Sequence, residues 1–88
     1  PCKATITEVQ PDFENPRRLL LFATLTGVSE KSLMVLDTLG RNLARCARRG
    51  TRVMGIRSVH APDCCLTLFL RVGYNRRLEE SHGRTAAV

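Results

Sequence analysis

Four separate stretches of the chain are rich in β-branched or other apolar residues, and they predict four β-strands. The predicted strands cover residues 3–10, 17–26, 53–60 and 64–73. The second of them, "RRLLLFATLT", is apolar on both faces, so we expect it at the centre of the sheet. One face of this strand is predicted to carry Leu19, Leu21, Ala23 and Leu25.

Residues 29–49 instead repeat with the period of an α-helix and predict one long helix. Ser29 is a suitable N-cap, and Gly50 is expected just after the last turn. Gly40 lies in the middle of the apolar face, where a glycine costs about 1 kcal/mol relative to alanine. We interpret it as a point of close contact with the sheet. The apolar face is formed by Leu33, Leu36, Leu39, Leu43 and Ala47.

The order strand, strand, helix, strand, strand predicts an α+β fold. We expect a four-stranded antiparallel sheet with the long helix on one face, in a permuted ferredoxin-like (ββαββ) arrangement. The predicted order across the sheet is first, second, fourth and third strand. "RRLEESH" predicts a short C-terminal helix, residues 1–82 a single domain, and residues 83–88 a flexible tail.

The 88 residues carry a net charge of +6, which favours acidic partners such as nucleic acid or an acidic protein surface. No apolar run approaches the roughly 20 residues of a membrane span, so we expect no membrane partner. The four cysteines form no C-x-x-C motif and no signal peptide opens the chain. These features predict free thiols and an intracellular location, in the cytoplasm or nucleus.

The stretch "LARCARRGTRVMGIRSVHAPDCCLTLFLRV", residues 43–72, resembles the second half of an ACT-type regulatory domain. The shared pattern is a helix that ends in Ala-Arg-Arg-Gly, a strand of the form V-x-G-I-x-S-V, a short turn and an apolar strand. "LLLFATLTGVSEKSL" is similar to the first strand and helix entry of that family. The resemblance implies a ferredoxin-like fold and a module that dimerises.

The sheet face turned away from the helix is predicted to be partly apolar, with Val53 among its members. So much outward apolar area favours a second buried surface, covered by a second copy of the chain or by a protein partner. We therefore expect a non-catalytic interaction or regulatory module. Alternatively, its aromatic and arginine side chains suit the stacking of single-stranded bases. The residues predicted to form this interface are Phe22, Thr24, Arg57, Val59, Thr67, Phe69 and Arg71.

Five arginines lie on the polar side of the predicted helix and just beyond it. They favour either a solvated helix face, whose last turn accommodates cations, or a stripe that follows a phosphate backbone. The second interpretation makes the protein a nucleic-acid-binding domain. The arginines are Arg41, Arg45, Arg48, Arg49 and Arg52.

Few residues in the sequence suggest a catalytic site or a metal site. Pro1 offers an N-terminal amine of the kind that tautomerases use as a base, and this is our further alternative. His60, Cys64 and Cys65 could offer three zinc ligands, but adjacent cysteines diverge in a strand and no fourth ligand is evident. We expect no metal, no cofactor and no catalytic set, and we expect Cys46 to be a small core residue.

Overall fold

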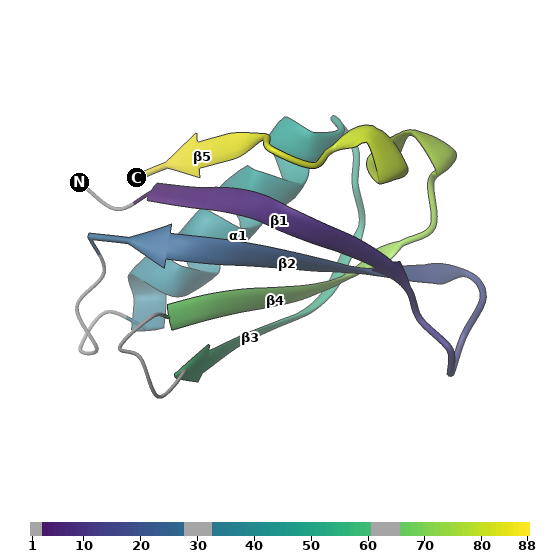
Figure 1. The fold of residues 1–88 in the computed structure, drawn as a ribbon, viewed down its shortest axis with the longest axis horizontal. Helices are drawn as coiled ribbons and strands as arrows, with labels where there is room; N and C mark the ends of the chain where they lie inside the picture. The colour runs from purple at the N-terminus through teal and green to yellow at the C-terminus, as the bar shows by residue number, and fades with distance from the viewer. Residues whose placement is uncertain (1–2, 28–32, 61–65) are drawn as a thin grey trace.

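The computed structural model describes residues 3–27, 33–60 and 66–88, which form a five-stranded sheet packed against one α-helix (Figure 1). The class is therefore α+β, as the sequence predicts. The strands are β1 (Lys3–Pro11), β2 (Arg18–Thr26), β3 (Val53–His60), β4 (Leu66–Gly73) and β5 (Thr85–Ala87). The helices are α1 (Leu33–Ala47) and the short 3₁₀ helix η1 (Arg76–Glu80).

Neighbouring strands are antiparallel throughout, in the order β3-β4-β2-β1-β5. The first four strands along the chain thus stand in the predicted order. β2 and β3 run in the same direction with β4 between them, and α1 makes the crossover that joins them (Figure 1). Among the described elements, α1 covers one face of the sheet and leaves the other face uncovered.

The core lies between α1 and the covered face of the sheet. Alternate residues of β2 point into it, which confirms the face predicted for Leu19, Leu21, Ala23 and Leu25. Leu39 and Leu43 are fully buried on the facing side of α1. The same aliphatic core includes Ala4, Ile6, Leu68, Leu70, Val72, Leu78 and Ala86.

Gly40 lies where α1 packs closely against the side chains of the sheet. A Cβ atom at this position would lie 3.0 Å from Ile56 Cδ1 and 3.1 Å from Leu70 Cδ2. These distances are shorter than ordinary van der Waals contact, so a side chain here would displace its neighbours. The close contact predicted for Gly40 is confirmed, and it explains a glycine within a helix.

The predicted four-stranded sheet is wrong by one strand, because part of the predicted tail forms β5 beside β1. Three residues are too few to produce a period in the sequence. Tertiary contacts position them instead: Leu78 of η1 is fully buried, and Gly83 has a φ of 86° in the following turn. Gly83 N donates to Ile6 O at 2.7 Å, and Ile6 N donates to Arg84 O at 2.9 Å.

Two details of the third strand and the helix ends also differ from expectation. Val53 packs against the core rather than on the outer face, because the pairing of β3 with β4 shifts register between Val53 and Gly55. α1 ends at Ala47, and Gly50 adopts a φ of 83° in the turn that follows. The predicted N-cap, Ser29, lies outside the described residues.

Candidate interaction face

The uncovered face of the sheet is centred on β2 and β4, whose outward residues pair across the two strands. Phe22 stands opposite Phe69, Thr24 opposite Thr67, and Leu20 opposite Arg71. β3 adds Arg57 beside Phe69 and Val59 beside Thr67. The structure therefore places on one face all seven residues predicted to form an interface: Phe22, Thr24, Arg57, Val59, Thr67, Phe69 and Arg71.

Phe22 and Phe69 form an aromatic pair at the centre of this open face. Their ring centroids are 5.0 Å apart and the ring planes meet at 68°, an edge-to-face geometry. The Arg71 guanidinium carbon lies 5.9 Å from the Phe69 ring centroid, within the range of a cation–π contact. Both rings are half-buried by their neighbours. Each retains accessible apolar surface that a further layer of protein would cover.

Four residues, one from each of four neighbouring strands, form a row across the open face that includes the two rings. The two charged residues lie at opposite ends of this row. Glu8 of β1 stands opposite Phe22 at one end of the row, and Arg57 of β3 stands opposite Phe69 at the other. The Gln10 side-chain amide donates to the Glu8 carboxylate, and this hydrogen bond holds Gln10 beside Glu8 at the β1 end of the row. The row therefore reads acid, aromatic, aromatic, base across β1, β2, β4 and β3.

Glu8 and Gln10 are members of this face that sequence reasoning missed. Strict alternation from Ala4 and Ile6 would direct both of them into the core. β1 instead shifts register between Ile6 and Glu8, which turns Glu8 and Gln10 outward and Val9 towards the core. The signal was the three-residue step between Ile6 and Val9, since a regular strand would repeat every second residue.

A hollow of about 160 Å³ interrupts the open face beside the central row. A Cβ atom on Gly55 would meet no atom within 4 Å, so the glycine leaves this space unfilled. Three arginine side chains make the lining of the hollow partly polar. It is lined by Arg18, Met54, Gly55, Arg57, Phe69 and Arg71.

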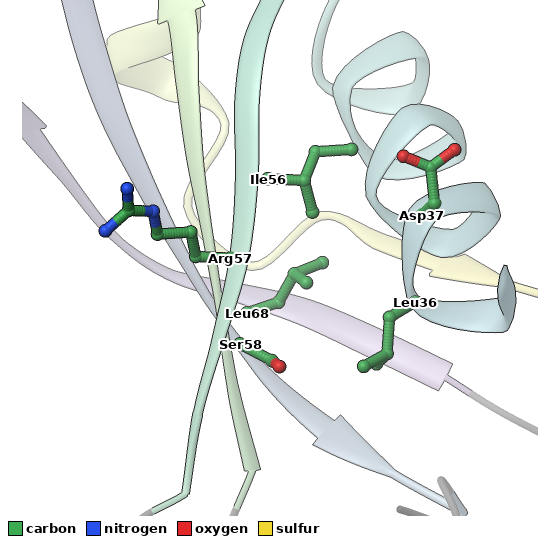
Figure 2. A pocket seen from close by; sticks show the side chains of 6 residues that line it. All are labelled: Leu36, Asp37, Ile56, Arg57, Ser58 and Leu68. Atoms are coloured by element: carbon green, nitrogen blue, oxygen red, sulfur yellow. The ribbon is translucent and has the colours of Figure 1, made fainter. Parts of the chain in front are cut away.

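The covered side of β3 contrasts with its open side, as Figure 2 shows. Ile56 and Leu68 point towards α1, where Leu36 faces them, whereas Arg57 points away from the helix. These side chains border a second hollow of about 230 Å³ at the edge of the sheet. Its one carboxylate, Asp37, is already paired with Arg41. This hollow is therefore a gap at the margin of the core, with little polar chemistry of its own.

The five predicted helix arginines lie along α1 and just beyond it, and their contacts differ. Arg41 Nε lies 3.1 Å from Asp37 Oδ2, in an exposed pair one helical turn apart. Arg52 lies beyond the helix, where its backbone carbonyl accepts from Gly73 N at 2.8 Å. Arg45 is exposed, while Arg48 and Arg49 line a separate polar hollow at the end of α1.

The candidate catalytic proline, the candidate zinc ligands and Cys46 remain to be placed. Pro1, Cys64, Cys65 and the side chain of His60 lie outside the described residues, so the tautomerase and zinc hypotheses stay untested. Cys46, expected in the core, is exposed as a free thiol because it lies on the solvent side of α1.

No family model, curated protein or solved structure matches this chain. None of the described helices is both long enough and apolar enough to cross a membrane.

Proposed function

We propose that the chain is a non-catalytic interaction module that pairs with a second copy of itself through the open face of its sheet. The observation that carries this proposal is the Phe22–Phe69 pair at the centre of a face that no described element covers. Aromatic side chains in the middle of a patch with a polar surround are typical of protein interfaces.

A second copy is favoured over an unrelated partner because the charge pattern of the face is complementary to itself. A two-fold interface must bring each surface patch against the same patch of the other subunit. A two-fold axis parallel to the strands, running between β2 and β4, exchanges the two ends of the central row. Glu8 of one copy would then face Arg57 of the other, and Phe22 would face Phe69.

The same axis also matches the hollow of the open face with a side chain that fits it. In the row beside the aromatic pair, Gln10 pairs with Leu20, and Arg71 pairs with Gly55. Exchange of the two ends would place Gln10 of one copy over Gly55 of the other copy, at the position where Gly55 leaves open space. The amide of Gln10 would there approach the arginines that surround the hollow, to which its oxygen can accept hydrogen bonds.

The open face is large enough for a small protein–protein interface. Four strands spaced about 4.8 Å apart and about 27 Å long present roughly 500 Å² in plan. A standard interface buries about 800 Å² per partner, so the open face lies towards the small end of the range.

The finer fold description supports the same proposal. We infer that β1, β2, α1, β3 and β4 form a permuted ferredoxin-like arrangement, and the resemblance to ACT-like regulatory domains implies pairing between copies. Regulation of a larger protein or complex would follow from that pairing. Single-stranded nucleic acid is the competing occupant of the face, since its bases stack on aromatic rings beside arginines.

The experiment is a comparison of Phe69→Asp with Met34→Asp by sedimentation velocity across a wide range of protein concentration. Met34 is 86% exposed on α1, so the control introduces the same charge away from the sheet. We expect the native chain and Met34→Asp to dimerise, and folded Phe69→Asp to remain a monomer, because an unpaired carboxylate would be buried at the centre of the interface. Equal dimerisation of both variants would contradict the proposal.

A further inference from the structure

A second site is formed at the end of α1 by arginines from three separate segments. Arg48 and Arg49 follow the helix, Arg77 belongs to η1, and Arg84 immediately precedes β5. Together they line one hollow of about 340 Å³, the largest of the hollows described here. It lies on the helix side of the molecule and shares no lining residue with the hollow of the open face.

The backbone positions of the arginines from the C-terminal segment are fixed by local contacts. Asn75 caps η1 by accepting from Arg77 N at 3.0 Å, and the fully buried Leu78 anchors this helix to the core. The backbone of Arg84 is tied to β1 through its bond from Ile6 N. The fold therefore holds Arg77 and Arg84 beside the helix end, with only their side chains free to adjust.

The positive charge of the hollow is not neutralised within the described part of the chain. The ion pairs found there are Arg18–Asp12 and Arg41–Asp37, so none of the four lining arginines is paired with a carboxylate. Glu80 is the one acidic residue that lines the hollow. The lining thus carries a formal charge of +3, from four arginines and one glutamate.

Stabilisation of the helix end explains only part of this cluster. Cations near the C-terminus of a helix interact favourably with its dipole, and Arg84 Nη1 donates to the carbonyl of Cys46 at 3.1 Å. Arg48 and Arg49 fit the same description. Arg77 does not, because its side chain makes no hydrogen bond to the helix end within the described residues and adds a fourth like charge to the same hollow.

We propose that this hollow binds a compact, multiply charged phosphate group, such as the pyrophosphate of a small phosphorylated ligand. Guanidinium groups bind phosphate oxygens with paired, charge-assisted hydrogen bonds, and several can share one group. Arginines that surround one hollow can all contact a ligand whose negative charges lie close together. A nucleic-acid backbone carries single charges spread along its length and would be followed by an extended stripe.

Isothermal titration of the native chain with inorganic pyrophosphate tests the proposal, with sodium chloride of equal ionic strength as the reference. We expect saturable binding of pyrophosphate that the double variant Arg48→Gln/Arg77→Gln weakens by about tenfold or more, since charge-assisted bonds are lost. Arg41→Gln, on α1 but outside this hollow and outside the open face, is the matched control and should retain the native affinity. Glu80→Gln should tighten binding, because it removes the one like charge beside the phosphate.

Three results would overturn the proposal. The first is native affinity in a folded Arg48→Gln/Arg77→Gln variant. The second is a pyrophosphate effect that chloride reproduces at equal ionic strength, which would show general screening of the arginines. The third is equally tight binding of a short oligonucleotide without terminal phosphates, which would identify a phosphodiester backbone as the ligand. Because neither the residues that line this hollow nor Arg41 belong to the open face, failure of dimerisation would leave this test unaffected.

Discussion

Reversing the charge of either Glu8 or Arg57 alone should weaken self-association. Reversing both charges together should restore it. Glu8→Arg would place arginine opposite Arg57 of the second copy, and Arg57→Glu would place two glutamates together. The double variant restores opposite charges at the same two positions. This pattern requires the proposed axis, since an axis perpendicular to the strands would bring Glu8 against Glu8.

The magnitude of the coupling follows from the separation of the two residues. Within one copy they are three strand spacings apart, or about 14 Å. Two charges at that distance in water, screened over about 8 Å, interact by only about 0.05 kcal/mol. Across the dimer they form two symmetric pairs at the rim, each worth about 0.5–1 kcal/mol. Loss of both pairs therefore raises the dissociation constant roughly 5- to 30-fold.

Sedimentation equilibrium of the native chain, both single variants and the double variant measures this coupling. Both residues are surface-exposed, so the variants should remain folded, which circular dichroism would verify. The restoration should also diminish at high salt, because rim charges are screened. A double variant that dimerises no better than the weaker single variant would refute the proposed pairing of Glu8 with Arg57.

Further substitutions test the fold that supports this face. Gly40→Val should lower the free energy of unfolding by about 1–3 kcal/mol through overpacking, and the loss should shrink in an Ile56→Ala background, as urea denaturation would reveal. Leu43→Ala should cost about 2–5 kcal/mol as a buried cavity forms, against less than about 0.5 kcal/mol for exposed Met34→Ala; equal losses would contradict the described core. Asp12→Ala should cost about 1–2 kcal/mol in thermal unfolding because the side chain caps its own loop, whereas Asp12→Asn, which keeps the accepting oxygen, should cost less than half as much.

Long regular patterns in the sequence were sufficient for most of the fold. The alternation in β2 and β4 and the helical period of α1 each continue over many residues, so a single exception does not obscure them. Gly40 was also informative, because its conformational cost within a helix requires a compensating contact. The order of the elements, placed in a permuted ferredoxin-like arrangement, predicted the order of the first four strands across the sheet.

Local irregularities and tertiary contacts account for what could not be predicted. Register shifts in β1 and β3 reversed the faces of Glu8, Gln10 and Val53, and one extra residue is enough to cause such a reversal. The position of β5 depends on the burial of Leu78 in the core, and the three residues of β5 carry no signal of this contact. The arginine hollow was likewise missed, since Arg77 and Arg84 approach Arg48 only after the C-terminal segment folds back along β1.

The most direct test of face-to-face pairing is an isotope-filtered nuclear Overhauser measurement on a mixture of labelled and unlabelled protein. Such a spectrum reports only contacts between different copies, so the pair within one copy does not contribute. At concentrations well above the dissociation constant, we expect cross-peaks between the ring protons of Phe22 in one copy and Phe69 in the other. A dimer without these cross-peaks, or a chain that stays monomeric at every concentration, would contradict the account.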